Sequence, residues 1–322
     1  MEAVLDQTLD VGTYLQSWLD HARGRVRQKT WQTYESMIRT RVGEDLRALP
    51  LADLHPLHLQ GLYAALLKTG LSGGSVLNLH LVLTNALSQA VRWGYIGANP
   101  AAGAQPPRPR RKELQVLDQQ ATEAILEAAS GTRMEAPIGI AIATGMRRGE
   151  VLGLRWPDID EAVTYAQVSR TLQNTTEGLV FEQPKTRRSR RKVVLPAFLK
   201  PYLKRQKADQ ALRREALGEA WVNEDVVVDF VDGSPWNPDS FTPAWAAFLR
   251  RAGLPHVRFH DLRHAHATLM LSKGVHPKIV SERLGHASIG ITLDTYSHVL
   301  PAMQQEAADA FDDLFSVDKA VS

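Results

Sequence analysis

The chain has 322 residues, a length typical of two domains, and 44% of them are hydrophobic, as in ordinary folded proteins. It contains no cysteine, which excludes disulfides, thiolate metal sites and cysteine nucleophiles. No apolar run reaches membrane-spanning length, and the N-terminal residues lack the basic-then-apolar order of a signal peptide. We therefore expect a cytoplasmic protein with no membrane partner.

Charge is distributed unevenly along the chain, although the formal net charge is only +3. Basic residues cluster in 23–41, 108–112 and 185–192, whereas the segment after Pro301 is acidic. Separate basic clusters on a nearly neutral chain favour a surface that binds a polyanion.

The first hundred residues show helical periodicity and no strand pattern. Apolar residues recur at helical spacing in 9–22 and 30–41. Pro56 can begin a third helix, and Ser72 can cap a fourth. Four helices predict a small all-α domain over residues 1–101. Taken alone, this half favours a generic helical interaction module over a DNA-binding domain.

A basic, proline-rich segment over residues 102–115 marks a domain boundary. Its prolines disfavour regular structure and favour an extended path. Its cations are Arg108, Arg110, Arg111 and Lys112. The segment is either a solvated linker or a strap that follows a phosphate backbone while the two domains grip opposite faces of a duplex.

Residues 116–300 predict a second, mostly helical domain with a small antiparallel β-sheet, so the whole chain is expected to be mainly α, of the α+β class. Helical patterns occupy 118–130, 133–145, 147–154, 197–217 and 237–253, with three more short helices in 260–298. Strand patterns occupy 163–172, 179–183 and 192–196, with another possible at 225–231. The turn between the last two sheet strands carries Lys185, Arg187, Arg188, Arg190 and Arg191.

Histidines and an arginine gather at the start of the 260–298 stretch. His260 and Arg263 are three residues apart, so on a helix they share a face and can point at one phosphate. Zinc binding through His260, His264 and His266 is disfavoured, because positions 264 and 266 diverge by about 200° on a helix. With no carboxylate cluster beside the histidines, we expect no metal site.

Three further residues have simple structural interpretations when each is taken alone. Arg147 could be a surface arginine paired with Glu150, His286 a cap after Gly285, and Tyr296 a core residue. Their order along the chain changes this interpretation. Arg147, Lys185, His260-x-x-Arg263, Gly285-His286 and Tyr296 occur in the order found in the tyrosine recombinase (phage integrase) family, which the sequence resembles.

The resemblance extends over nearly the whole chain. The motifs TGMRRGE, PKTRRSRR, HDLRHAHAT, LGH and TLDTYSH are similar to those of integrases from phages and conjugative elements. The segment AVRWGYIGANP is similar to that family's SAM-like core-binding domain, which residues 1–101 would form. Many such integrases carry an additional arm-binding domain ahead of it. Here the first helix pattern begins about ten residues in, so either that domain is absent or the chain is a truncated or simpler form, and arm-site binding stays open.

The resemblance implies DNA cleavage and rejoining without a cofactor, metal or ATP. Tyr296 would attack the scissile phosphate, leaving a 3′-phosphotyrosyl bond and a free 5′-hydroxyl. Arg147, Arg263 and His286 would stabilise the transition state, and Lys185 would protonate the leaving group. His260 would take the tyrosine proton or position the phosphate, and Glu150 would orient an arginine.

The implied partners are double-stranded DNA attachment sites, a homotetramer on paired sites with a four-way junction, and an accessory directionality factor. Such a protein would be associated with the nucleoid. Residues 301–322 predict an amphipathic acidic helix that packs on its own domain or exchanges between protomers. Three alternatives stay open: a non-catalytic DNA-binding protein on the same fold, a type IB topoisomerase-like enzyme, and a metal-dependent nuclease, which the missing carboxylates disfavour.

Overall fold

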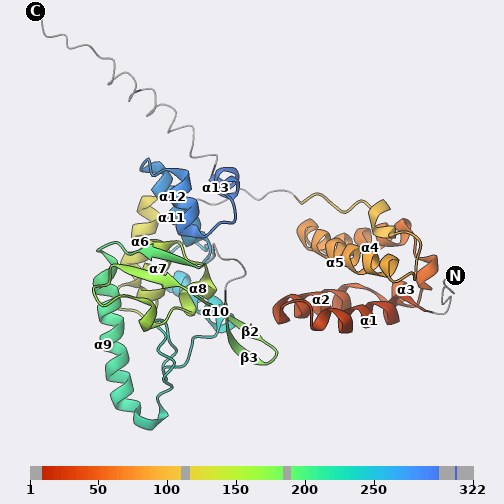
Figure 1. The fold of residues 1–322 in the computed structure, drawn as a ribbon. Coiled ribbons are helices and arrows are strands. Elements are labelled where there is room, and N and C mark those ends of the chain that lie inside the picture. The colour runs from red at the N-terminus through yellow and green to blue at the C-terminus, as the bar shows by residue number, and fades with distance from the viewer. Residues whose placement is uncertain (1–8, 110–116, 184–189, 297–308, 310–322) are drawn as a thin grey trace, which may run out of the picture. The chain divides into compact units, whose positions relative to one another are not determined.

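The computed structural model describes residues 9–109, 117–183, 190–296 and 309. The chain divides into two compact units, Met1–Glu113 and Leu114–Ser322 (Figure 1). The predicted mainly α architecture with a small antiparallel β component is confirmed. No helix in the described part of the chain is long and apolar enough to cross a membrane.

Among its described residues, the first unit contains the four predicted helices, one additional short α-helix and two 3-10 helices. Its elements are α1 Val11–Arg23, α2 Gln28–Arg41, α3 Glu44–Arg47, η1 Leu51–Asp53, α4 Pro56–Lys68, α5 Gly73–Arg92 and η2 Pro100–Gly103. Ser72 caps α5 by accepting a hydrogen bond from the Ser75 amide at 3.2 Å. Tyr14 is fully buried and donates its hydroxyl to the Ala86 carbonyl at 2.5 Å, joining α1 to α5.

The folded core of the first unit continues past residue 101. Ala101 and Ala104 are both buried in this core. The Gln105 amide donates to Gln60 Oε1 at 3.0 Å, which holds the chain against α4. The extended, proline-rich path therefore begins at about residue 105, where regular secondary structure ends.

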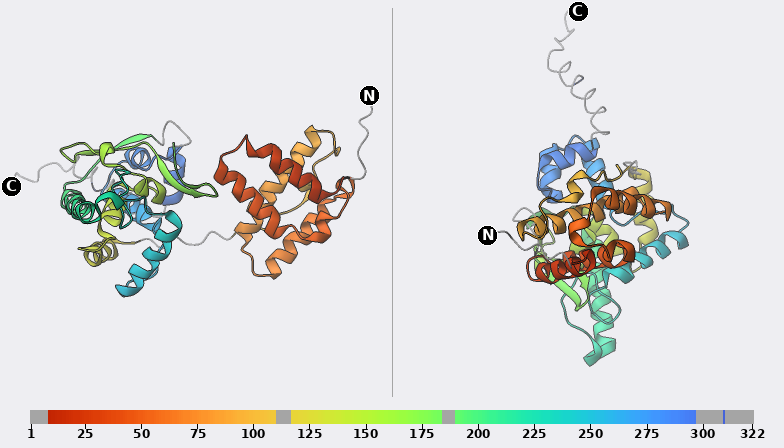
Figure 2. Two further views of the ribbon diagram at one scale, coloured as in Figure 1. Left: turned by 90° about the horizontal axis from the view of Figure 1, so that it is seen from below. Right: turned by 90° about the vertical axis from the view of Figure 1, so that its right-hand side faces the viewer.

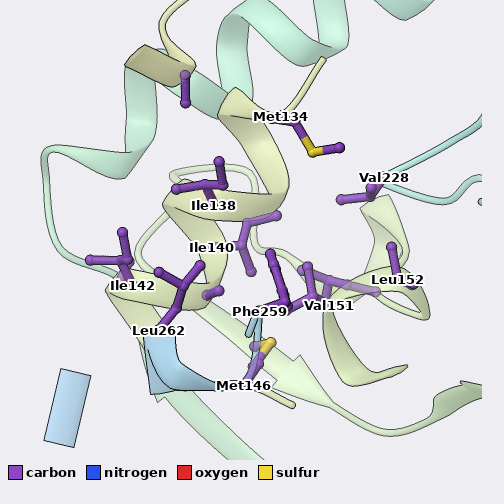
Figure 3. Close-up of a cluster of buried hydrophobic side chains, with 14 of the residues drawn as sticks. Met134, Ile138, Ile140, Ile142, Met146, Val151, Leu152, Val228, Phe259 and Leu262 are labelled. Atoms are coloured by element: carbon purple, nitrogen blue, oxygen red, sulfur yellow. The ribbon is translucent and has the colours of Figure 1, made fainter. Parts of the chain in front are cut away.

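The second unit is built around a buried helix. Its helices are α6 Gln119–Ala129, α7 Glu135–Thr144, α8 Arg148–Leu152, η3 Trp156–Asp158, α9 Leu199–Leu217, η5 Gly218–Ala220, α10 Pro238–Arg251, α11 Asp261–Ser272, α12 Pro277–Leu284 and α13 Ile289–Tyr296. Every residue of α7 is buried, which explains why its sequence is apolar on all sides. It packs against α6, α8, α9 and α11. Figure 3 shows Ile138, Ile140 and Ile142 in this core near Phe259 and Leu262.

The strands form two separate two-stranded antiparallel sheets, whereas the sequence predicted one. They are β1 Tyr165–Val168, β2 Thr171–Thr175, β3 Gly178–Glu182 and β4 Arg191–Val194, with β1 paired to β4 and β2 to β3. The expected strand over 163–172 breaks at Ser169 and Arg170. Both side chains bind the Asp158 carboxylate, at 3.1 and 2.6 Å, which pulls this part of the chain toward η3.

The strand expected over residues 225–231 does not form. Only isolated bridges occur there, from Val226 to Arg155 and from Asp229 to Pro235. The backbone of Asp225 has a positive φ of 53°, which is incompatible with a regular strand. The buried Asp229 carboxylate instead binds Arg213 on α9 at 2.6 Å.

The last three helices, coloured blue, lie together in every view (Figures 1 and 2). They share a small cluster of buried apolar side chains that comprises Ala267, Leu271, Val280, Leu284 and Tyr296. Two glycines in the left-handed conformation end the helices that face this group, Gly145 after α7 (φ 65°) and Gly285 after α12 (φ 67°). These two turns place the residues that follow them beside α11.

Candidate functional site

Arg147 is the N-cap residue of α8 and follows the turn at Gly145 by two residues. Its backbone amide donates to Glu150 Oε2 and its guanidinium to Glu150 Oε1, each at 2.9 Å. The Arg147 side chain keeps 41% of its surface exposed, so it pairs with Glu150 while its outer face meets solvent. A second guanidinium nitrogen lies 3.4 Å from the Gly285 carbonyl, which brings Arg147 close to the turn before His286.

Glu150 also holds a second arginine from β4. Arg191 Nη2 donates to Glu150 Oε2 at 2.9 Å, and both side chains are at least 94% buried. Burial alone would raise the pKa of Glu150, but Arg191 and Arg147 outweigh this effect and lower it. Glu150 is therefore an anion that orients two arginines, as the sequence suggested for one.

Arg191 does not fit the predicted role of a surface DNA contact. Its side chain is buried, and its Nε donates to the Arg283 carbonyl at 2.5 Å on α12. The burial of β4 alternates, so Arg191 lies on the same inward face as Val193. Of the other basic candidates, Arg108 and Arg190 are exposed. Outside the described residues lie Arg110, Arg111, Lys112, Lys185, Arg187, Arg188 and, apart from Asp309, the segment 301–322.

Arg263 is the most deeply buried cation of the site. It lies on the first turn of α11 and donates through Nη1 to the Gly145 carbonyl at 2.7 Å. Its Nη2 is buried and has no hydrogen-bond partner in the described part of the chain. Burial, followed by repulsion from Arg147, lowers the pKa of Arg263 to about 9, which still leaves a cation at neutral pH. A buried guanidinium with a free donor is suited to receive an anion.

Two histidines lie beside these arginines. His286 Nδ1 is 2.8 Å from the Thr292 hydroxyl, and burial followed by Arg263 lowers its pKa to about 4. His260 precedes α11 and keeps contact with solvent. Desolvation by surrounding atoms lowers the pKa of His260 to about 4, and electrostatic repulsion from His264 and Arg263 adds to this effect. Both rings are therefore neutral at pH 7 and can each donate one hydrogen bond.

Tyr296 is the last residue of α13 and is only 1% exposed. Its hydroxyl lies 2.8 Å from His264 Nδ1. Burial raises the pKa of Tyr296 to about 12, while Arg263 acts in the opposite direction. The phenol is thus protonated at neutral pH and lies within electrostatic range of a cation.

The second unit therefore brings Arg147, His260, His286 and Tyr296 within electrostatic range of Arg263 at the start of α11. The sequence-based prediction assigned no role in this group to His264 beyond the rejected zinc site. The signal for it was its position beside Arg263, one residue further along the same helix. Among the described residues, no three His, Asp or Glu side chains are grouped as metal ligands. A pair of cations, neutral imidazoles and a phenol suits phosphoryl transfer to a tyrosine.

Comparison with known proteins identifies the family of the chain. Residues 115–303 match the phage integrase family, and residues 11–67 match its N-terminal SAM-like domain. The chain belongs to the phage integrase family. It is thus a tyrosine recombinase by family, and the resemblance in its motifs is confirmed.

Similar proteins include phage, transposon and conjugative-element integrases. A "Tyrosine recombinase XerC-like" protein of Caldanaerobacter subterraneus subsp. tengcongensis is 31% identical over 96% of this chain and 84% of its own length. The ICEBs1 integrase of Bacillus subtilis is 30% identical over 77% of this chain and 68% of its own.

Solved structures show the same fold. The Tn1549 transposon integrase (residues 82–397) in complex with a circular intermediate DNA superimposes with a TM-score of 0.80 at 20% identity, covering 94% of this chain and 99% of that one. A lambda integrase from a tetramer bound to a Holliday junction has a TM-score of 0.69 at 20% identity, covering 90% and 79%.

Proposed function

We propose that this tyrosine recombinase cuts and rejoins DNA at specific sites through a covalent bond between Tyr296 and a 3′-phosphate. The observation that carries the proposal is the buried Nη2 of Arg263, which has no hydrogen-bond partner among the described residues. The same guanidinium interacts electrostatically with the Tyr296 phenol. An anion site next to an oxygen nucleophile supports attack on a phosphodiester.

The arginines would stabilise the pentacovalent transition state. Negative charge gathers on its non-bridging oxygens, and guanidiniums can donate two parallel hydrogen bonds to them. Arg147 and Arg263 are the two donors, and Glu150 fixes the orientation of Arg147. By analogy with loss of one oxyanion donor, each arginine contributes about 3–4 kcal/mol.

The remaining groups complete the phosphoryl transfer. Neutral His286 would donate to a non-bridging oxygen, and His260 would bind the phosphate or take the tyrosine proton. Lys185, which lies outside the described residues, would protonate the 5′-oxygen as it leaves. The covalent intermediate conserves the energy of the phosphodiester, so rejoining needs neither ATP nor a metal.

Exchange between two duplexes extends this chemistry to recombination. A 5′-hydroxyl from a partner duplex can attack the phosphotyrosine, which joins strands from two sites through a four-way junction. This scheme needs four chains on paired sites. The acidic segment 301–322 would either pack on its own domain or exchange between chains. The integrases among its relatives support integration or excision of a mobile element. The direction of that reaction would be set by an accessory directionality factor.

DNA would be gripped by both units. The first unit would read the attachment site, and the exposed cations Arg108 and Arg190 would bind phosphates. Arg110, Arg111, Lys112, Arg187 and Arg188 extend this basic set in the sequence. A protein with these contacts would be found with the nucleoid.

Covalent capture from a random library tests the proposal whatever the attachment site is. The chain is mixed with nicked duplexes that carry a random core, in excess EDTA, and DNA retained on protein after SDS is sequenced. We expect retained duplexes to share one site. Retention that SDS abolishes would indicate a non-catalytic binding protein, and dependence on a divalent ion would indicate a metal nuclease. Supercoil relaxation without strand exchange between two captured sites would favour the topoisomerase-like alternative.

A further inference from the structure

The Tyr296 hydroxyl is paired with a histidine that the proposed chemistry leaves unused. His264 Nδ1 lies 2.8 Å from that hydroxyl, a normal hydrogen-bond distance. The two rings are tilted, with centroids 5.8 Å apart, so the contact is made through the ring nitrogen. This pairing joins α11 to α13 across 32 residues of sequence.

We propose that His264 accepts the proton of Tyr296 during attack, which leaves His260 to bind the phosphate. The inference rests on the proposed function of Tyr296. His260 contacts His264 edge to face, with ring centroids 5.0 Å apart, and it lies at the exposed start of α11. His264 and Arg263 are adjacent on one helix, so α11 carries both the proton acceptor and the phosphate clamp.

The protonation states around His264 support this role. Burial raises the pKa of Tyr296 to about 12, so a negligible fraction of the phenol is ionised at pH 7 and a base must remove the proton during attack. Burial also lowers the pKa of His264, with Asp261 opposing and Arg258 and Arg263 assisting. The imidazole is therefore neutral at pH 7 and, with its proton on Nε2, presents Nδ1 as an acceptor.

The step balances without any further reactant. The phenol oxygen bonds to phosphorus as the bond from phosphorus to the 5′-oxygen breaks. The phenol proton moves to His264 Nδ1, and the 5′-oxygen receives a proton from Lys185. On rejoining, the 5′-hydroxyl attacks phosphorus and its proton returns to Lys185, while His264 returns its proton to the tyrosine oxygen as that oxygen leaves. Because Tyr296 is buried, its hydroxyl must first be uncovered when DNA binds.

The test measures the rate of adduct formation against pH for His264→Asn. The probe is a duplex of captured sequence with sulfur in the 5′-bridging position, because a thiolate leaves without a proton and removes Lys185 from the profile. Asparagine keeps a polar atom near the position of Nδ1 but cannot accept a proton. At pH 7 we expect a loss of about 10²–10⁴-fold. The variant's rate should then rise about tenfold per pH unit with the phenolate fraction and approach the wild-type rate at alkaline pH.

Two results would overturn the inference. One is a His264→Asn variant that forms adduct at the wild-type rate. The other is a loss by the same factor at every pH, which would indicate that His264 only positions the tyrosine. His260→Asn is the matched control, and we expect its loss to be independent of pH. Circular dichroism and non-covalent binding of the same duplex confirm folding. Absence of adduct from the wild-type chain would instead contradict the proposed function itself.

Discussion

The Arg191 guanidinium and the Glu150 carboxylate form a buried ion pair at 2.9 Å that joins β4 to α8. Glu150 also binds the catalytic candidate Arg147 through the other carboxylate oxygen. The position of Arg147 thus depends on the Glu150 carboxylate, which the buried Arg191 holds in place. Removing a partner from such a pair leaves an uncompensated buried charge.

We expect Glu150→Gln to lower the free energy of unfolding by about 3–5 kcal/mol, because Arg191 stays buried without its anion. Chemical denaturation of the purified chain measures this. Glu35→Gln is the control, since Glu35 pairs with Arg39 on the exposed surface of α2. That change should cost at most about 0.5 kcal/mol. Equal losses in the two variants would contradict the structural role of Glu150.

Gly145→Ala should destabilise the second unit more than Gly131→Ala. Both glycines have positive φ, 65° and 70°, so an alanine at either is strained by about 1–2 kcal/mol. A Cβ on Gly145 would lie 2.6 Å from Leu284 and 2.7 Å from His266, whereas a Cβ on Gly131 would meet nothing within 4 Å. This crowding adds roughly 1–3 kcal/mol. Denaturation midpoints that fall equally would show that α7 and α12 are not closely packed there.

His266 should make the protein sensitive to acid. Its Nδ1 donates to the Ile142 carbonyl at 2.8 Å, and burial lowers its pKa from 6.5 to about 4. The unfolded chain therefore binds a proton at higher pH than the folded chain does. The stability that neutral His266 contributes is complete above pH 6.5 and is lost as pH falls toward 4, by roughly 3 kcal/mol.

His266→Gln tests this pH dependence. We expect the variant to lose some stability at pH 7 but to lose roughly 3 kcal/mol less than the wild type between pH 7 and pH 4. The exposed His256 provides the control, and His256→Gln should retain the full acid sensitivity. An unchanged slope for His266→Gln would show that its burial does not control the acid response.

Arg263→Lys should slow adduct formation by about 10²–10³-fold, because an ammonium cannot reproduce the forked donor that binds phosphate and the Gly145 carbonyl together. Single-turnover assays on a captured duplex measure the rate. Arg250→Lys, on the exposed surface of α10, should leave the rate within about twofold of wild type. If both variants kept the wild-type rate, Arg263 would not bind the scissile phosphate.

Local signals predicted the helices well, because proline starts and glycine stops are encoded within a few residues. Ser72, Asp118 and Gly145 all lie at the helix ends where the sequence placed them. The sheets were harder to predict, because strand pairing depends on distant partners. The strand breaks at Ser169 because its side chain binds Asp158, eleven residues earlier. The alternation of apolar residues gives no sign of this break.

At the site, too, short motifs could be recognised from the sequence, whereas contacts between distant residues could not. The order of the motifs along the chain identified the residues that lie around α11, because this order is typical of the family whose chemistry those residues suit. It did not separate Arg191 from its basic neighbours, although strand alternation placed that side chain beside Val193 on the buried face. The contact between His264 and Tyr296 also could not be predicted from the sequence, since it depends on how α13 packs against α11.

The most direct test of the central claim is to identify the amino acid that becomes linked to DNA. Captured adducts are digested with protease and nuclease, and the nucleotide-bearing peptide is sequenced by mass spectrometry. We predict a 3′-phosphate joined to the oxygen of Tyr296, and no such peptide from Tyr296→Phe, which should still bind the duplex. A linkage to any other residue, to a 5′-phosphate, or an adduct that persists in Tyr296→Phe would contradict the account.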